Sequence, residues 1–260
     1  MSDDFVLAEQ HEGVAIVTLN RPERRNGLSA GLCHALHARL TEIAASETQV
    51  LILRGAGRDF CVGADLSAAA VSESGEAPPA RASKAYDIPL LLHTMPQVTI
   101  ASIDGGCAGA GLGWAAACDM RFASDRAKFA TGFIKVGAAG DMGLVWSLMR
   151  VVGAARAREL LFFSQKFGSA EALQWGLVTR VFEAGELAGA TLDAAQTLAR
   201  FAPQALRALK TNVLSAEELA MRPYTEIETA RHLHLAAGTT MREGFASFRA
   251  KRADGSKTET

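Results

Sequence analysis

The stretch that decides the fold class is residues 98–129, VTIASIDGGCAGAGLGWAAACDMRFASDRAKF. It opens with an apolar run at 98–105 that is typical of a buried strand, and residues 118–124 are a candidate for another. Between them, three glycines at 109–113 lead into an apolar, helix-prone segment. Strand and helix alternate, which indicates a layered α/β fold. Residues 109–117 hold no acid or base, so any chemistry at this turn must use peptide groups.

The flanking sequence extends this pattern. Two short β-rich runs at 5–9 and 14–19, separated by HEG, predict a hairpin, and VLILRG at 50–55 predicts a buried strand. Apolar residues recur every three or four positions over 28–45 and predict an amphipathic helix: Leu28, Leu32, Leu36, Leu40 and Ile43. Residues 67–83 are rich in Ser, Ala, Gly and Pro and predict a surface loop. After residue 186 only helical patterns follow, so we predict a core at 1–185 and a helical region at 186–260.

Composition excludes several classes of protein. The chain has 260 residues, of which 49% are hydrophobic, as in an ordinary globular protein. Its 27 basic and 28 acidic side chains give a net charge of -1, so no global field attracts nucleic acid or an anionic membrane. The four cysteines form no CxxC pair and the N-terminal residues show no apolar signal region, which together favour a cytoplasmic setting.

Common cofactor and metal motifs are also missing from the sequence. The glycines at 109–113 do not fit GxGxxG, because the third comes one position early and the strand lies deep in the chain. No GxxxxGK[ST] or GxSxG sequence occurs. Neither histidine pair has a nearby third ligand, so we expect no metal: His34 with His37 and His232 with His234. Cys107 and Cys118 lie in apolar sequence and are expected to be inert thiols.

A second glycine-containing turn suggests what the first one does. DFCVGADLS at 59–67 follows the buried strand at 50–55, just as the glycine loop follows the strand at 98–105. Two such turns could each direct one backbone N–H at a common point, which is the arrangement of an oxyanion hole. The helix that follows the glycine loop adds partial positive charge at its N-terminus. We therefore predict that the site polarises a carbonyl through its backbone.

The chain resembles the crotonase, or enoyl-CoA hydratase/isomerase, family nearly from end to end. The resemblance lies in VTLNRPERRNGLS, VLILRGAGRDFCVGADL, the 98–129 stretch, VVGAARARELLFFSQKFGSAEALQWGLVTRV and the terminal GFASFRAKR, in the family's order. It implies an α/β spiral of ββα units followed by a helical trimerisation region. It also implies a homotrimer or a dimer of trimers, an acyl-CoA thioester as ligand, and no cofactor besides the coenzyme A of the substrate.

Carried over position by position, the resemblance assigns roles to individual residues. The oxyanion donors would be the N–H groups of Ala64 and Ala110. Coenzyme A contacts would fall on a larger set, with Arg25 and Lys251 open to the alternative of being solvated surface charges: Glu23, Arg24, Arg25, Ala64, Asp65, Leu66, Phe248 and Lys251. Tyr86, Gly109, Gly113 and Phe133 would line the substrate pocket.

The sequence departs from the family's hydratases at two positions. Hydratases hold water between two glutamates, and the matching residues here are Gly113 and Phe133, neither of which can transfer a proton. Asp141 stands where dienoyl-CoA isomerases and 4-chlorobenzoyl-CoA dehalogenases of the family carry a working aspartate. The dehalogenases pair theirs with a histidine and a tryptophan, whereas this chain has Tyr86 and Phe133 at those positions. Asp141 could instead cap the helix that follows it.

We therefore predict an enzyme that holds an acyl-CoA thioester oxygen on the amides of Ala64 and Ala110. Asp141 would act as acid, base or nucleophile in an isomerisation, hydration or hydrolysis. The alternative is a non-catalytic acyl-CoA binding protein on the same fold, which is favoured if Asp141 proves to be only a helix cap.

Overall fold

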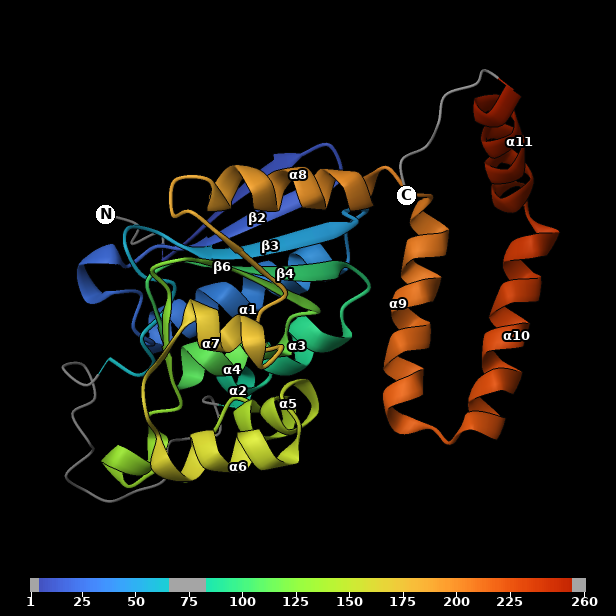
Figure 1. The fold of residues 1–260 in the computed structure, drawn as a ribbon. Helices are drawn as coiled ribbons and strands as arrows, with labels where there is room; N and C mark the ends of the chain where they lie inside the picture. The colour runs from blue at the N-terminus through green and yellow to red at the C-terminus, as the bar shows by residue number, and fades with distance from the viewer. Residues whose placement is uncertain (1–4, 66–82, 254–260) are drawn as a thin grey trace. The chain divides into compact units, whose positions relative to one another are not determined.

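The chain forms two units in the computed structural model, which describes residues 5–65 and 83–253 (Figure 1). The first unit ends at Ala199 and the second begins at Arg200. The sequence placed this boundary at residue 185. The later position follows from helix α8 (Leu187–Ala199), which packs on strands of the first unit through buried Leu187, Thr191 and Ala195.

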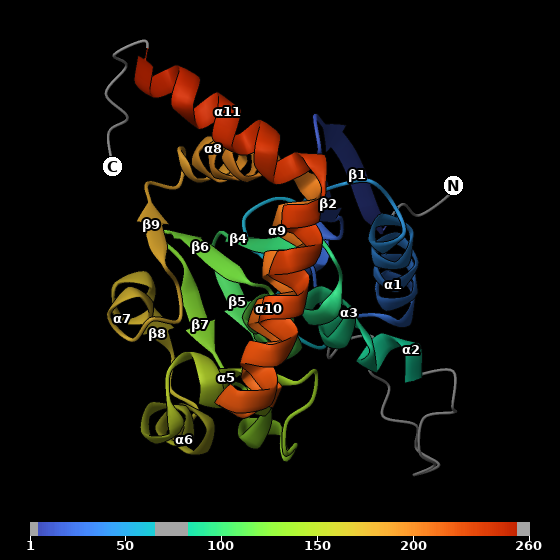
Figure 2. The same ribbon diagram turned by 90° about the vertical axis from the view of Figure 1, so that its right-hand side faces the viewer.

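A six-stranded sheet forms the centre of the first unit. Its strands lie in the order β1-β2-β3-β4-β6-β9, with only β1 and β2 antiparallel. The bounds are β1 Val6–His11, β2 Val14–Leu19, β3 Val50–Gly55, β4 Val98–Ile103, β6 Met120–Ser124 and β9 Arg180–Phe182. The predicted hairpin and the strands at 50–55, 98–105 and 118–124 are therefore confirmed, with small changes at their ends. Figure 2 shows β6 and β9 side by side at one edge.

A smaller sheet and a set of short helices complete the unit. The strands β5 (Gly106–Ala108), β7 (Lys128–Ala130) and β8 (Phe167–Gly168) pair in the order β5-β7-β8. The helices are α1 Ala30–Ala44, α2 Ser83–Tyr86, α3 Ile88–Thr94, α4 Ala110–Ala117, α5 Leu144–Val151, α6 Ala154–Phe163 and α7 Ser169–Gln174. Two 3₁₀ turns are η1 (Pro22–Arg24) and η3 (Phe133–Val136). The predicted loop at 67–83 lies almost entirely outside the described residues.

Helix α1 shows how the amphipathic pattern becomes packing. Its N-cap is Ser29, whose hydroxyl accepts the Leu32 N–H at 3.2 Å. The periodic residues Leu32, Leu36 and Leu40 are fully buried, and the helix packs against α3, β1 and β2. The prediction was wrong about Leu28, which lies before the helix and forms a β-bridge with Ala64 instead. This error matters because the bridge shapes one of the two predicted oxyanion turns.

The second unit is helical, as the sequence predicted. Helices α9 (Pro203–Glu218) and α10 (Met221–Ala237) pack side by side as a helical hairpin, and α11 (Thr239–Ala253) continues from the end of α10 (Figure 1). Pro203 stands in the first turn of α9, where its missing N–H breaks no helical bond. In the described part of the chain, no helix combines the length and apolar character needed to cross a membrane.

Candidate active site

The first predicted turn is held by the bridge between Leu28 and Ala64. The Leu28 N–H donates to the Gly63 carbonyl at 2.8 Å, and the Asp65 N–H donates to the Leu28 carbonyl at 3.1 Å. Because peptide groups alternate in direction along an extended chain, the N–H of Ala64 faces away from Leu28. Ala64 is exposed, and its N–H has no acceptor within residues 5–65 and 83–253.

The second predicted turn is held by strand β7. The Gly109 N–H donates to the Ala130 carbonyl at 3.0 Å, and Gly109 has a φ of 52° and a ψ of -124°, which a side chain would strain. Helix α4 begins at the next residue, so the N–H of Ala110 belongs to the first helical turn, which has no intrahelical acceptor. The helix dipole adds partial positive charge at this point.

The two turns approach each other closely at Gly63 and Gly109. A Cβ atom on Gly109 would lie 3.7 Å from the Cα of Gly63, and a Cβ atom on Gly63 would lie 3.6 Å from the Cα of Gly109. Residues 64 and 110 each follow one of these glycines directly. The structure therefore brings the turns that carry Ala64 and Ala110 so close that a single added Cβ atom would span the space between them, although they are far apart in the sequence.

Phe133 connects this pair of turns to the segment that carries Asp141. The tip of its ring, Cζ, lies 3.9 Å from the Cβ position of Gly109, and its Cδ2 lies 3.9 Å from the Cβ position of Gly140. Phe133 is half-buried at the start of η3. An apolar ring thus fills space between the turns and residue 140.

Gly113 has a steric explanation. A Cβ atom at this position would lie 2.7 Å from the Met142 carbonyl oxygen and 2.9 Å from the Met142 Cβ. The Met142 backbone therefore occupies the space that a side chain at residue 113 would need. The segment that carries Asp141 therefore packs directly against Gly113.

We predict that Gly113→Ala lowers the free energy of unfolding by about 1–3 kcal/mol, the usual cost of overpacking a core. The added Cβ must push away backbone at Met142, which cannot move as freely as a side chain. Gly189→Ala is the matched control, because it lies in helix α8 with nothing within 4 Å of the Cβ position and should stabilise the helix. Chemical denaturation of both variants measures the difference. Equal stability of Gly113→Ala and the wild type would contradict the packing described.

Asp141 is not a helix cap. Helix α5 has Gly143 as its N-cap with no side-chain hydrogen bond, and the Leu144 N–H donates to the main-chain carbonyl of Asp141. The carboxyl Oδ1 of Asp141 is buried and has no hydrogen-bond partner among the described residues. Burial raises the pKa of this carboxyl above its ordinary value. A desolvated carboxyl without a structural partner is a typical feature of a proton-transfer group.

The backbone around Asp141 is unusual. Gly140, Met142 and Gly143 all have positive φ, at 111°, 50° and 66°. Met142 is buried and is not a glycine, so its left-handed conformation costs energy that the surrounding packing must supply. Such strain is concentrated at functional sites, and here it fixes the direction of the residue between Gly140 and Met142.

The four cysteines are buried, which fits the inert role expected from the sequence for Cys107 and Cys118. Burial, and then the charge of Asp141, raise the pKa of Cys33 to about 11, and burial raises the pKa of Cys61 to about 12. Burial also raises the pKa of Cys107. All four thiols are buried and none forms a disulfide. These residues are packing groups behind the turns, since a protonated thiol is a poor nucleophile.

Tyr86 lines a separate apolar cavity of about 310 Å³. Its walls come from α3, the end of α4 and the start of α5, and include His93 and Trp146, whose rings pack edge to face at 5.0 Å. Gly143 is also part of the wall, so the cavity begins two residues from Asp141. The structure thus places Tyr86 near the Asp141 segment but gives no contact between Tyr86 and Ala64 or Ala110.

The predicted coenzyme A contacts divide into three groups. Glu23, Arg24 and Arg25 are exposed on and after η1. Asp65 is largely buried and pairs with Arg21 at 3.0 Å, so its carboxylate already serves a structural role. Ala64 belongs to the first turn described above, and Leu66 and the side chains of Phe248 and Lys251 lie outside the described residues.

Sequence reasoning missed Asn26, which joins two loops of the site. Asn26 is fully buried with φ 53°; its Oδ1 accepts the Arg21 N–H at 2.9 Å, and its Nδ2 donates to the carbonyls of Ala56 and Asp59 at 2.9 and 2.7 Å. The available signal was the Asn-Gly pair at 26–27, because asparagine before glycine favours left-handed turn geometry. Asp59, which is also buried, was missed as well.

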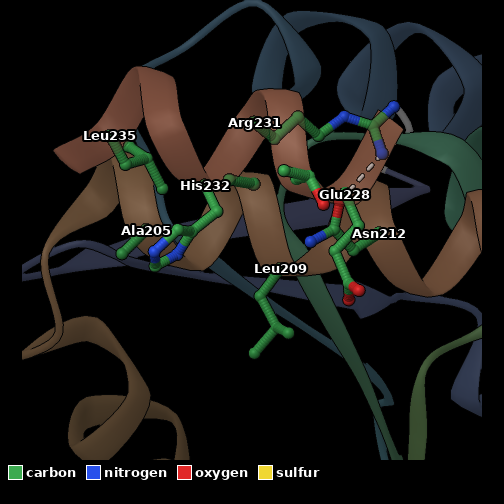
Figure 3. Close-up of a pocket in the computed structure, with 9 residues that line it drawn as sticks. Ala205, Leu209, Asn212, Glu228, Arg231, His232 and Leu235 are labelled. Carbon is green, nitrogen blue, oxygen red and sulfur yellow. Dashed lines mark hydrogen bonds between the residues drawn. The ribbon is translucent and has the colours of Figure 1, made fainter. Parts of the chain in front are cut away.

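A second cavity lies within the helical unit and contains none of the predicted site residues (Figure 3). It has a volume of about 370 Å³ and lies between α9 and α10. Arg231 Nη1 donates to Asn212 Oδ1 at 2.8 Å and to Ser215 Oγ at 3.1 Å across the two helices. These bonds join α9 to α10. The polar side chains of this cavity therefore serve to hold the two helices together. Among the described residues no group of three His, Cys, Asp or Glu could hold a metal ion.

The sheets, the C-terminal helices and the paired turns define a protein of the crotonase fold. Residues 9–256 match the family model described as enoyl-CoA hydratase/isomerase, and the chain belongs to this enzyme family. It is 34% identical over 255 residues to 1,2-epoxyphenylacetyl-CoA isomerase of Escherichia coli (strain K12), covering 96% of this chain and 97% of that protein. It is 29% identical to 4-chlorobenzoyl coenzyme A dehalogenase-2 of an Arthrobacter species, covering 96% of this chain and 92% of the relative.

Solved structures agree with this assignment. The structure of a putative enoyl-CoA hydratase from Streptomyces coelicolor A3(2) has a TM-score of 0.88 to this chain at 29% identity, with 95% of this chain and 92% of that one covered. The family therefore includes proteins named as hydratases, isomerases and dehalogenases. The chemistry of this chain depends on its own residues.

Proposed function

We propose that this enzyme binds an acyl-CoA thioester, polarises its carbonyl on the N–H groups of Ala64 and Ala110, and transfers a proton with Asp141. The main support for the proposal is the close approach of Gly63 to Gly109, which brings the two turns together. Asp141 supports it, because its buried Oδ1 has no other role among the described residues.

The proposed chemistry follows from charge. Removing a proton from the carbon next to a thioester moves negative charge to the carbonyl oxygen. Two fixed N–H groups at that oxygen stabilise this charge, and each is typically worth about 10²–10³ in turnover. The Asp141 carboxylate accepts the proton and returns it to another carbon of the acyl group, which moves a double bond without water or metal.

Isomerisation fits this chain better than hydration by the usual glutamate pair. Gly113 and Phe133 offer no groups to hold and activate water, and a side chain at 113 would collide with Met142. One acid remains, and a single carboxylate is enough to move one proton between two carbons. Hydrolysis or attack by Asp141 as a nucleophile uses the same arrangement and stays within the proposal.

The acyl group we propose is unsaturated, cyclic or aromatic, and its tail would enter the cavity beside Asp141. The walls include the aromatic rings of Tyr86, His93 and Trp146, which suit a planar apolar group. The two relatives named above act on an epoxyphenylacetyl and a chlorobenzoyl thioester according to their names. The cavity volume of about 310 Å³ lies at the lower end of ordinary ligand pockets.

Incubation with a panel of acyl-CoAs, followed by mass and NMR analysis of the products, tests the proposal. The panel should hold 2-enoyl, 3-enoyl, cyclic and aryl thioesters. We expect an unchanged mass with a moved double bond or opened ring for at least one of them. Tight binding of acyl-CoAs without any turnover would support the alternative, a non-catalytic binding protein.

We predict that the acidic limb of the turnover profile lies above the ordinary pKa of aspartate, about 3.9. Burial raises the pKa of Asp141, so its base form appears only as the pH rises past that raised value. Turnover measured from acidic to neutral pH, with unfolding monitored in the same buffers, separates titration from denaturation. A flat profile down to the ordinary aspartate range would contradict the role of Asp141 as a base.

The proposal also includes the assembly and the cellular setting. We propose a homotrimer or a dimer of trimers in the cytoplasm, with coenzyme A entering only as part of the substrate. Family resemblance supports the assembly, and the four reduced, buried cysteines suit a reducing compartment. Sedimentation equilibrium distinguishes monomer, trimer and hexamer.

A further inference from the structure

The buried carboxylate of Asp59 binds two other segments of the site. Its side chain is 3% exposed. Oδ1 accepts the Gly106 N–H at 2.7 Å and Arg25 Nη2 at 3.1 Å, and Oδ2 accepts Arg25 Nε at 2.7 Å. Arg58 Nε lies farther away, 3.7 Å from Oδ2. Burial alone would raise the pKa of Asp59, but the bonds from Arg25 and Gly106 outweigh it, and the pKa lies below its usual value.

The backbone opposite Asp59 is shaped around this carboxylate. A Cβ atom on Gly106 would lie 2.8 Å from Asp59 Oδ1, and one on Gly105 would lie 2.9 Å from the same oxygen and 1.9 Å from the Arg58 carbonyl. The glycine pair at 105–106 therefore permits a close approach that no other residue type would allow. Gly105, Gly106 and the Asp59 carboxylate therefore pack closely together.

Main-chain hydrogen bonds link the segment that begins at Asp59 to the segment that leads to Gly109. The Phe60 N–H donates to the Asp104 carbonyl at 2.7 Å, and the Cys61 N–H donates to the Gly106 carbonyl at 3.1 Å. The Ala108 N–H in turn donates to the Cys61 carbonyl at 2.9 Å. Residues 59–61 and 104–108 thus run together as far as Gly63 and Gly109.

We infer that Asp59 is a positioning residue, which holds the Ala64 and Ala110 turns at the spacing that a thioester oxygen requires and partly neutralises Arg25, the side chain proposed to contact the coenzyme A phosphates. This inference rests on the proposed function for the identity of the ligand. The Arg25 side chain is 55% exposed, and Asp59 uses only Nε and Nη2, so Nη1 remains available for an anion. Bidentate pairing fixes the plane of the guanidinium.

The inference predicts two effects of opposite sign for Asp59→Asn. The negative charge beside Arg25 disappears, so the attraction of Arg25 for phosphate increases. At the same time the bond to Gly106 weakens and the turns lose their fixed spacing. A purely structural role predicts the reverse for binding, because a loosened site binds every ligand less tightly.

The test uses coenzyme A as one probe and an acyl-CoA with a ¹³C-labelled thioester carbonyl as the other. Calorimetry gives the Kd of coenzyme A, and isotope-edited infrared spectroscopy gives the carbonyl stretch, which moves to lower frequency when the oxygen accepts hydrogen bonds. For Asp59→Asn we expect coenzyme A to bind about two- to fivefold tighter, the factor that corresponds to one exposed ion pair. We expect most of the wild-type carbonyl shift to be lost.

Glu9→Gln is the matched control. Glu9 also accepts a bond from an arginine, Arg54 Nη2 at 2.9 Å, and it lies on β1, outside the segments that connect the two turns. We expect this variant to keep the wild-type Kd and carbonyl shift. Gly106→Ala tests the same contact from the other segment. Its Cβ would press on the movable ends of the Asp59 and Arg25 side chains, so this variant should also diminish the carbonyl shift.

The outcomes separate this inference from the proposed function. If the wild type binds coenzyme A and lowers the carbonyl frequency while Asp59→Asn and Gly106→Ala match it, the positioning role is overturned and the proposed function stands. Parallel losses of affinity and thermal stability in Asp59→Asn also overturn it. If the wild type shows neither binding nor a shift, the proposed function fails and the inference fails with it.

Discussion

The Asp141→Asn variant is expected to lose turnover by about 10²–10⁴, the usual contribution of a positioned acid or base, while its fold becomes more stable. The loss follows because Asn cannot accept a proton at physiological pH, and no described residue provides a second carboxylate at this place. Undiminished turnover of the active acyl-CoA would exclude the proposed role.

The gain in stability has a definite pH dependence. The pKa of Asp141 is raised in the folded state, so the folded protein holds this proton more tightly than the unfolded chain. The ionised carboxylate therefore destabilises the fold above the raised pKa, and Asn removes that cost at neutral pH. Below the ordinary aspartate pKa the carboxyl is neutral in both states, and the variant should have no advantage.

Thermal denaturation of wild type and variant at neutral and at acidic pH measures this effect. Asp193→Asn is a suitable control because Asp193 is exposed on α8 and should change neither stability nor turnover. A lower melting temperature of Asp141→Asn at neutral pH would show that the carboxylate has a stabilising partner. The opposite changes in activity and stability are what a strained functional residue predicts.

The Ala110→Pro variant is expected to lose about 10²–10³ in turnover, with a moderate loss of stability because Ala110 is buried. Ala110 is the first residue of α4, a position that tolerates proline because its N–H has no intrahelical acceptor. The substitution removes the donor N–H and places ring carbons where the thioester oxygen would bind. Gly109 precedes it and can adopt the extended, positive-φ geometry required without a side-chain clash.

Ala30→Pro is the matched control for this substitution. Ala30 is the first residue of α1, is exposed, and follows the N-cap Ser29, whose hydroxyl bonds Leu32 rather than residue 30. Turnover is compared well below the melting temperature of either variant, where only Ala110→Pro should lose it. Equal activity of the two variants would mean that the Ala110 N–H does not contact the reacting oxygen.

The fold could be predicted where local pattern decides structure. The hairpin, the buried strands and the α1 helix follow from periodicity, because each buries one continuous apolar face. Leu28 was misplaced because a leucine that continues a helical period can also end a β-bridge, and the choice depends on Ala64, which is distant in sequence. The boundary at Ala199 was missed because α8 looks like the helices that follow it.

The site could be predicted only in part. The two glycine turns were found from sequence, and Asp141 was selected by its position in the family pattern. The packing of Met142 against Gly113 and the bonds of Asn26 and Asp59 depend on loops meeting in three dimensions. No sequence spacing encodes those contacts. The absence of a cap from Asp141 likewise needed the start of α5 to be known.

The most direct measurement of the central claim is the infrared carbonyl frequency of a bound, ¹³C-labelled acyl-CoA in wild type and in Ala110→Pro. If the amides of residues 64 and 110 hold the thioester oxygen, the wild-type band lies below its frequency in water and the variant recovers much of the difference. A wild-type band at the solution frequency, for a ligand shown by calorimetry to be bound, would contradict the account.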